Sequence, residues 1–126
     1  MAPRSLITVI DDDESVRRSL PSLLKEFGFA ARAFSSAAEF LASDALAESS
    51  CLILDVRMPE MSGPDLQQEL TRRQRALPII FITASPDEGL RQPLLKRGAV
   101  ECLFKPFSET ALSEAIDAAL ETGTHR

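Results

Sequence analysis

The sequence predicts an α/β fold of the (βα)5 type, in which a five-stranded parallel sheet is doubly wound with helices. Short apolar runs rich in β-branched residues recur along the chain, and such runs suit strands that are covered on both faces. Between these runs the apolar residues follow the 3.6-residue period of an amphipathic helix. Because strands and helices alternate, right-handed crossovers must place the helices on both faces of one parallel sheet.

Four of the strands are predicted clearly, and a polar residue follows each of them. They cover residues 6–10, 51–54, 79–82 and 100–104, and the residues that follow are Asp11, Asp55, Thr83 and Lys105. Residues 29–34 form a weaker fifth candidate, which we expect at an edge of the sheet.

The first helix has the most regular pattern of the five. Its apolar residues at positions 16, 20, 23, 24 and 27 share one helical face, and Gly28 ends the pattern. Pro21 lies inside this helix and removes a backbone donor, so we expect a kink there.

The other helices have recognisable ends. Ser36 begins a capping box before the second helix, and Ser62 caps the third, with Pro64 near its first turn. The fourth helix contains Pro93, so it either runs through this proline or begins late, with Pro93 in its first turn. These four helices are expected near residues 36–41, 62–70, 90–95 and 108–120.

Length and composition fit one compact cytoplasmic domain. The chain has 126 residues, of which 44% are apolar, and no apolar run approaches the roughly 20 residues that a membrane helix needs. We therefore expect neither secretion nor membrane insertion. The formal net charge of −5 argues against direct binding of nucleic acid, which requires a basic face.

Two smaller features have plain explanations. Arg72, Arg73 and Arg75 form a basic cluster that we interpret as a solvated helix end, where cations complement the helix dipole. Cys51 and Cys102 lie in apolar stretches and belong to no CxxC pair, so we expect buried free thiols rather than a disulfide.

The residues that follow the strands carry the chemistry. Ligand sites of doubly wound sheets lie at the carboxyl ends of the strands, so several carboxylates, a hydroxyl and an ammonium should meet in one shallow pocket. Clustered carboxylates raise one another's pKa unless a cation intervenes, and Mg²⁺ binds one or two carboxylates together with waters and phosphate oxygens. A carboxylate beside Mg²⁺ and Lys105 is placed to attack phosphorus, and Thr83 and Lys105 can bind the oxygens of an aspartyl phosphate.

Each of these residues also has a plainer interpretation. The three aspartates at positions 11–13 can cap the first helix, Thr83 can be a turn residue, and Lys105 can be an ordinary surface lysine. Their joint placement at the ends of strands favours the functional interpretation.

Four motifs at these positions resemble the CheY-like response-regulator receiver family, and within it the FixJ-like branch of transcriptional regulators. The motifs are VIDDDE at 9–14, LDVRMPEMSG at 54–63, ITA at 82–84 and FKPF at 104–107, and the second is close to diagnostic by itself. The resemblance covers about residues 6–121. It implies a flavodoxin-like sheet with strand order 2-1-3-4-5, a receiver domain over residues 1–121, and a tail or the start of a linker over residues 122–126.

The resemblance also assigns roles to individual residues. It implies that Asp55 is the phosphoryl acceptor and that Mg²⁺ is held by Asp12 and Asp55, by the main-chain carbonyl of Arg57 and, partly through water, by Asp11. Thr83 would be the switch hydroxyl and Lys105 the partner of the phosphate. Ala84 would leave the phosphoryl group access, and the bond between Lys105 and Pro106 would be cis.

A receiver domain of this family acts as a switch rather than as an enzyme on an external metabolite. It takes a phosphoryl group from a cognate histidine kinase or a small phosphodonor, and it promotes its own phosphorylation and dephosphorylation. Phosphorylation would shift the face made by the fourth helix, the fifth strand and the fifth helix. That face would then form a homodimer or engage an output domain, such as a C-terminal DNA-binding domain.

Two departures from the family pattern concern the coupling to this face. Cys102 stands where the family often has an aromatic residue that rotates with the switch threonine, and Cys102 is too small to fill the same pocket. The loop at residues 85–87, with Pro93 beyond it, also departs from the usual pattern. A receiver-like interaction module that works without phosphorylation therefore remains an alternative.

Two further alternatives fit the sequence less well. A phosphohydrolase resembling the haloacid dehalogenase family would need a second aspartate, acting as general acid, where Arg57 stands. A nucleotide-binding module would need a glycine-rich phosphate loop, and all five glycines are isolated.

Overall fold

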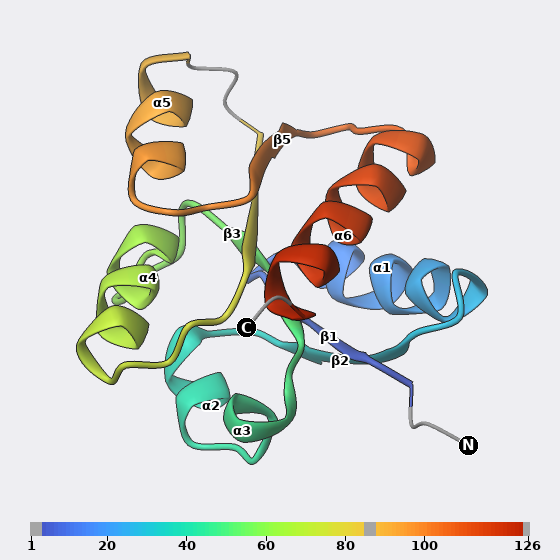
Figure 1. The fold of residues 1–126 in the computed structure, drawn as a ribbon, viewed down its shortest axis with the longest axis horizontal. Coiled ribbons are helices and arrows are strands. Elements are labelled where there is room, and N and C mark those ends of the chain that lie inside the picture. Colours follow the sequence, from blue (N-terminus) through green and yellow to red (C-terminus); the bar gives the residue numbers. More distant parts are fainter. Residues whose placement is uncertain (1–3, 85–87, 125–126) are drawn as a thin grey trace.

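The computed structural model describes residues 4–84 and 88–124, and it confirms a doubly wound parallel sheet (Figure 1). The strands are β1 (Leu6–Ile10), β2 (Ala30–Phe34), β3 (Cys51–Asp55), β4 (Ile79–Thr83) and β5 (Glu101–Phe104). All pairings between neighbouring strands are parallel, and the order is β2-β1-β3-β4-β5. Both the expected strand order and the edge position of the weakest strand candidate are therefore confirmed.

The helices match the expected pattern with one addition. They are α1 (Glu14–Glu26), α2 (Ala37–Leu41), α3 (Ala45–Glu48), α4 (Gly63–Arg72), α5 (Glu88–Lys96) and α6 (Glu109–Thr124). The second expected helix is α2, and the short helix α3 was not expected, so the third, fourth and fifth expected helices are α4, α5 and α6. The structure rules out a late start for the fourth helix, because α5 begins five residues before Pro93.

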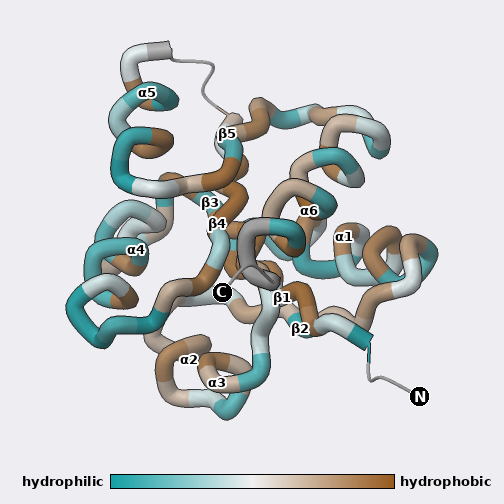
Figure 2. The backbone as a smooth tube through the Cα atoms, viewed as in Figure 1, coloured by the Kyte–Doolittle hydropathy of each residue, from teal (hydrophilic) through white to brown (hydrophobic). Residues whose placement is uncertain are grey.

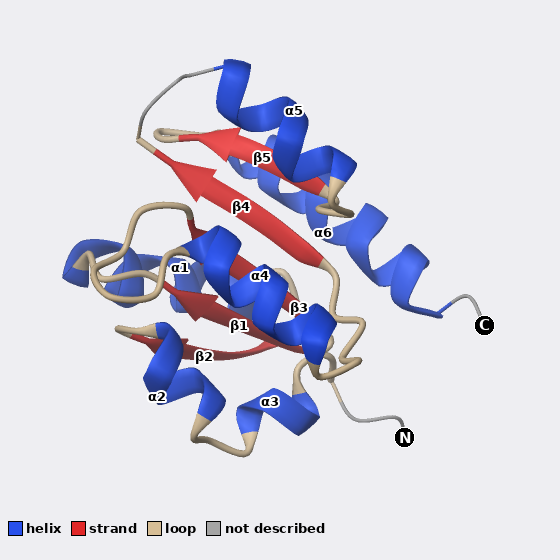
Figure 3. Ribbon diagram, turned by 90° about the vertical axis from the view of Figure 1, so that its left-hand side faces the viewer, coloured by secondary structure: helices blue, strands red, loops and turns tan. Residues whose placement is uncertain are grey.

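The helices cover the two faces of the sheet unequally. Helices α1 and α6 lie against one face, and α2 to α5 lie against the other (Figure 3). Alternate side chains of each strand point to opposite faces, so Leu52 and Leu54 pack under α4 whereas Ile53 packs under α1 and α6. The hydrophobic segments accordingly lie in the middle of the molecule, and most hydrophilic ones lie on the outer sides of the helices (Figure 2).

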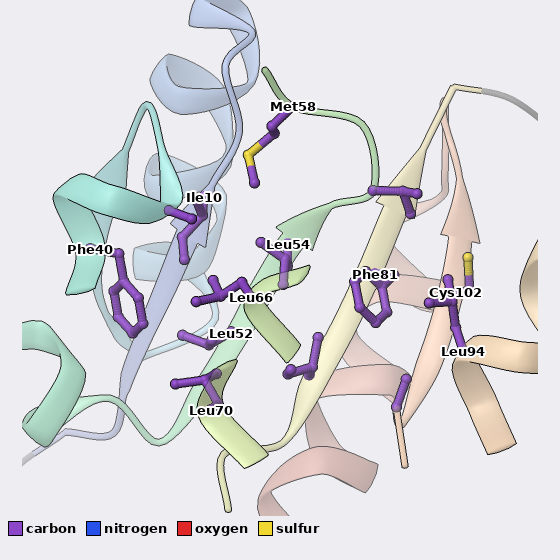
Figure 4. Packing of buried hydrophobic residues seen from close by; sticks show 14 of the residues in the cluster. Ile10, Phe40, Leu52, Leu54, Met58, Leu66, Leu70, Phe81, Leu94 and Cys102 are labelled. Carbon is purple, nitrogen blue, oxygen red and sulfur yellow. The ribbon is translucent and has the colours of Figure 1, made fainter. Parts of the chain in front are cut away.

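The larger of the two cores lies between the sheet and helices α2 to α5. Leu66 and Leu70 of α4 lie beside Leu52 and Leu54 of β3, with Phe40 on one side of this group and Leu94 on the other (Figure 4). Full burial of one such side chain contributes about 1.5–3 kcal/mol. This core fixes the positions of α4 and β3, which carry the residues of the site described below.

Three helices end in the same way. The amide of the second residue beyond the C-cap donates to a carbonyl in the last turn: Phe29 to Leu24, Arg75 to Leu70 and Ala99 to Leu94. The residue between C-cap and donor has a positive φ in each case, and it is Gly28 at 98°, Gln74 at 60° and Gly98 at 103°.

The remaining expectations concern proline, cysteine and the basic cluster. Helix α1 includes Pro21, while the kink expected there stays a prediction. Both cysteines are buried free thiols, as expected. Arg72 and Arg73 lie at the end of α4 and form ion pairs with Glu69, so the interpretation as a helix end is confirmed for these two residues. It is wrong for Arg75, whose half-buried side chain donates from Nη2 to the carbonyl of Leu46 at 2.7 Å.

Helix α6 extends beyond the expected boundary of the domain. Its helical backbone continues to Thr124, three residues past the expected end at Glu121. The loop at residues 85–87 lies outside the described residues. Within the described part of the chain, no helix is both long and apolar enough to cross a membrane.

Candidate functional site

The carboxyl ends of four strands surround one polar pocket. Because the strands are parallel, Asp55 ends β3, Thr83 ends β4, and Asp11 and Lys105 directly follow β1 and β5. The residues that line the pocket are Asp11, Asp12, Asp13, Asp55, Arg57, Thr83, Ala84 and Lys105. The structure thus brings together every site residue expected from the sequence.

Asp11 is wholly buried, and each of its polar groups has a partner. Its amide donates to the carbonyl of Phe34 at 3.1 Å. Its two carboxylate oxygens accept from the amide of Asp13 and from Nζ of Lys105, both at 2.9 Å. Its main-chain carbonyl accepts from Nη1 of Arg17 at 3.0 Å. Asp11 is therefore held rigidly, with both carboxylate oxygens already engaged.

Asp55 lies beside this arrangement with only 7% of its surface exposed. Burial and the charge of Asp11 raise the pKa of the Asp55 carboxyl group to about 7, although Lys105 acts in the opposite direction. The distance from Nζ of Lys105 to Oδ1 of Asp55 is 3.8 Å. Ionised Asp55 therefore lacks enough positive charge around it, and a further cation would stabilise it.

Lys105 joins the two carboxylates. Burial disfavours its ammonium, but the hydrogen bond and the charge of Asp11, with a smaller contribution from Asp55, outweigh this and raise the pKa of Lys105. Lys105 is therefore charged wherever the site operates near neutral pH. The bond between Lys105 and Pro106 is cis, as expected.

The third aspartate of the run has a different task from the first two. Oδ1 of Asp13 accepts from the amide of Ser15 at 2.9 Å and from its hydroxyl at 2.8 Å, and these bonds lower the pKa of Asp13. Asp13 is the N-cap of α1. The plainer interpretation as a helix cap is thus correct for Asp13 and leaves Asp11 and Asp12 for the site.

Asp11, Asp12 and Asp55 can hold a metal ion. Each offers a carboxylate oxygen, and these oxygens lie within 4.8 Å of one another. An all-oxygen set with excess negative charge fits a hard divalent cation, and the exposed position of Asp12 leaves room for the waters that Mg²⁺ keeps. The donor set and the raised pKa of Asp55 therefore agree with a magnesium ion.

Two residues without a predicted role also shape the site. Arg17 binds the main chain of Asp11, as described above. Gly63 donates its amide to the carbonyl of Val56 at 3.0 Å, so the first turn of α4 touches the end of β3. A Cβ atom at Gly63 would collide with the carbonyl of Asp55 and would lie 2.9 Å from Cε1 of Phe81. The absence of a side chain at position 63 thus lets α4 pack against the backbone of Asp55.

The start of α4 is fixed by its own cap as well. The hydroxyl of Ser62 accepts from the amide of Asp65, and the carboxylate of Asp65 accepts from the amide of Ser62. This reciprocal capping box, one residue before Gly63, determines where the loop after Asp55 ends.

Comparison with known proteins agrees with this geometry. The sequence profile of the response regulator receiver domain matches residues 7–117. The chain belongs to the response-regulator receiver family. Receiver domains of this family serve two-component signal transduction, and the expected family and function are therefore confirmed.

The relatives also support the FixJ-like branch, because FixJ of Azorhizobium caulinodans is 40% identical to the chain over 119 residues. The chain is 43% identical over 123 residues to nodulation protein W of Bradyrhizobium diazoefficiens and 44% identical over 117 residues to response regulator protein TodT of Pseudomonas putida. These matches cover 98% and 93% of the chain. It spans about half the length of both proteins, 54% and 52% respectively.

A solved structure with the same fold is the crystal structure of FixJ-N. It has a TM-score of 0.84 and 36% sequence identity, and the match covers 95% of this chain and 96% of that one. The flavodoxin-like, CheY-like receiver fold expected from the sequence is thus confirmed.

Proposed function

We propose that Asp55 accepts a phosphoryl group, with Mg²⁺ held by Asp11, Asp12, Asp55 and the main-chain carbonyl of Arg57. The observation that carries this proposal is the meeting of Asp55 with two further aspartates and Lys105 at one edge of the sheet. When bound, Mg²⁺ supplies positive charge that stabilises the oxygens of the transferring phosphoryl group.

The reaction forms one bond and breaks one. An ionised Asp55 oxygen forms a bond to phosphorus while the bond between phosphorus and the donor atom breaks, and the donor leaves with the electron pair. For a histidine kinase the donor atom is an imidazole nitrogen. Lys105, 3.8 Å from Asp55, is close enough to pair with the oxygens of the product, and the buried Thr83 at the end of β4 can donate its hydroxyl to them.

The consequence of phosphorylation would be a shift of the face formed by α5, β5 and α6. Thr83 ends β4 beside Phe104 of β5, and Lys105 directly follows β5, so a pull on either side chain reaches this face. We propose that this face forms a homodimer or engages an output domain that controls transcription. FixJ, one of the similar proteins, is a transcriptional regulatory protein, of which this chain spans 56%.

The partners and location follow from the same family. We propose a cognate histidine kinase as phosphodonor and a cytoplasmic location. Residues 1–121 would be the receiver domain, which promotes its own phosphorylation and dephosphorylation, and residues 122–126 would lead towards a C-terminal DNA-binding domain. The formal net charge of −5 supports an indirect effect on DNA rather than contact by this domain.

Intact mass spectrometry with acetyl phosphate tests the acceptor. We expect one added phosphoryl group in the presence of Mg²⁺, none in EDTA, and none in Asp55→Asn under either condition. Incorporation into Asp55→Asn at the level of the wild type would place the acceptor elsewhere.

A phosphorylation-independent interaction module is the second candidate. It is favoured by Cys102, which is 3% exposed and packs near Leu94 and Phe81 where the family often has an aromatic residue (Figure 4). A wild-type chain that neither gains a phosphoryl group nor binds beryllofluoride would support this candidate over the first.

A further inference from the structure

Arg17 and Arg18 are neighbours in the first turns of α1 but have different surroundings. Nη1 of Arg17, a half-buried residue, donates to the main-chain carbonyl of Asp11 at 3.0 Å. The side chain of Arg18 is 76% exposed and pairs at 3.0 Å with Glu14, whose side chain is 73% exposed. One arginine thus reaches back to the acidic turn after β1, and the other lies in solvent.

The hydrogen bond from Arg17 to Asp11 differs from the three other hydrogen bonds of Asp11 described above in where its partner comes from. The amide of Asp11 binds a carbonyl of β2, one carboxylate oxygen binds the amide of the helix cap Asp13, and the other binds Lys105. Two of these partners are main-chain groups, and the third is a lysine of the site itself. Among the residues that the structure describes, Arg17 alone holds Asp11 with a side chain from outside the pocket.

We propose that Arg17 is a positioning residue, which fixes the backbone of Asp11 and thereby the orientation of the Asp11 and Asp12 carboxylates for Mg²⁺. This inference rests on the proposed function. Asp11 is wholly buried, so its carbonyl has no water to replace a lost partner and the turn would move to find one. A shift of the turn would displace both carboxylates from Asp55.

The charge of Arg17 has the opposite effect to its hydrogen bond. A nearby guanidinium repels Mg²⁺, so removal of the charge alone would strengthen Mg²⁺ binding. Loss of the hydrogen bond would weaken it. Arg17→Met removes both, whereas Arg18→Met removes the same charge one residue away and no contact to the site. Arg17→Lys keeps the charge at this position, so its comparison with Arg17→Met separates positioning from electrostatics.

The experiment is calorimetric titration of the full chain with MgCl₂ for the wild type, Arg17→Met, Arg17→Lys and Arg18→Met. We expect Arg17→Met to weaken Mg²⁺ binding roughly three- to tenfold, within the range for the net contribution of a typical hydrogen bond. Arg18→Met should bind as the wild type does or slightly more tightly. Arg17→Lys keeps the charge and one donor, and its affinity should lie between those of the wild type and Arg17→Met.

Melting temperatures in EDTA provide the structural control. If Arg17 only stabilises the fold, Arg17→Met melts at a lower temperature but binds Mg²⁺ like Arg18→Met, and the proposal is overturned. A Lys variant no better than the Met variant also overturns it. If Arg17→Met does not fold, the comparison of Arg17→Lys with the wild type decides in the same way. A wild type that binds no Mg²⁺ would instead refute the proposed function itself.

Discussion

Asp55 combines burial with a neighbouring negative charge, and both make its ionised form unfavourable in the absence of metal. Its pKa of about 7 in the folded protein lies above the 3.8 of an isolated aspartate. Between these two values the folded chain keeps a proton that the unfolded chain has lost. The contribution of Asp55 to stability is therefore full below about pH 4, falls as the pH rises through 7, and is constant above that.

This sign predicts how Asp55→Asn behaves without metal. In EDTA, the variant should be more stable than the wild type at pH 8, by on the order of 1–3 kcal/mol, because it carries no charge at this position. At pH 4 the two should be nearly equal. Urea unfolding at both pH values measures the difference, and other carboxyl groups cancel because both proteins contain them. Equal stabilities at pH 8 would contradict the proposed charge imbalance.

For individual residues, the sequence predicts the chemical groups of the site better than it predicts the residues that hold those groups in position. Asp55, Thr83 and Lys105 were predictable because each stands at a strand end, where parallel topology brings them together. Arg17 was not, since a guanidinium that reaches back six residues leaves no periodic signal. Gly63 lies in the diagnostic motif, but its role depends on how closely α4 approaches β3, which is a matter of packing.

Among the secondary-structure elements, the three similar helix ends differ in the residue that adopts the positive φ. Helices α1 and α5 place glycine at the position of positive φ, and α4 places Gln74 there. A residue with a Cβ atom pays about 1–2 kcal/mol in this conformation, and glycine does not. The C-terminal end of α4 is thus less stable than it would be with glycine at position 74 and the same hydrogen bonds.

Gln74→Gly should therefore stabilise the domain, by about 0.5–1 kcal/mol after the larger entropy loss of glycine on folding. Thermal unfolding with the same Mg²⁺ concentration for both proteins measures it. Gly98→Gln at the equivalent position of α5 is the reverse control and should destabilise by a similar or larger amount. A destabilised Gln74→Gly would show that the Gln74 side chain makes a contact worth more than the backbone strain.

Helix α5 is attached differently from the others. Of its described side chains only Leu94 is buried, while polar groups supply two more links. Arg91 pairs with Glu101 of β5 at 2.6 Å, and Nε2 of Gln67 lies 3.4 Å from the carbonyl of Arg97. Polar links of this kind are individually weak and rearrange easily, which suits a helix on the face that we propose to shift.

The short helix α3 was not expected from the sequence, although α2 begins and ends where expected. Between the two helices, the hydroxyl of Ser43 donates to the carbonyl of Phe40 and accepts from the amide of Ala45. A serine that competes locally for backbone groups is common in helices and loops alike, so the second short helix leaves no distinct pattern in the sequence.

For the molecule as a whole, Mg²⁺ and folding should be linked. A ligand that binds only the folded state stabilises it by about 2.7 kcal/mol at one hundred times its Kd, or roughly 10 °C in melting temperature for a domain of this size. We expect this rise between EDTA and saturating MgCl₂ in scanning calorimetry.

Two aspartate variants make the prediction specific. Asp12→Asn removes a carboxylate of the metal cluster and should lose most of the rise. Asp117→Asn removes an exposed carboxylate of α6 and should keep it. A similar rise in both variants would mean that Mg²⁺ acts through general screening of the negative chain.

The overall architecture was almost fully predictable because several independent patterns in the sequence point to the same fold. Strand runs, helical periods and caps agree with one another along the chain, and only β2 at the sheet edge was weak. Its alanines at positions 30, 31 and 33 lack the branched side chains that mark the inner strands. No residue of β2 is fully buried, so this strand needs less apolar volume than the inner strands and its signal is weak for a physical reason.

The ion pair between Asp11 and Lys105 joins residues 94 positions apart. Chains are made from the N-terminus, so the acidic residues leave the ribosome well before the lysine that completes their pocket. A truncated or half-made polypeptide can assemble several strands and still lack this cation. The phosphoryl acceptance that we propose therefore requires the last strand to be made and paired, because Lys105 directly follows β5.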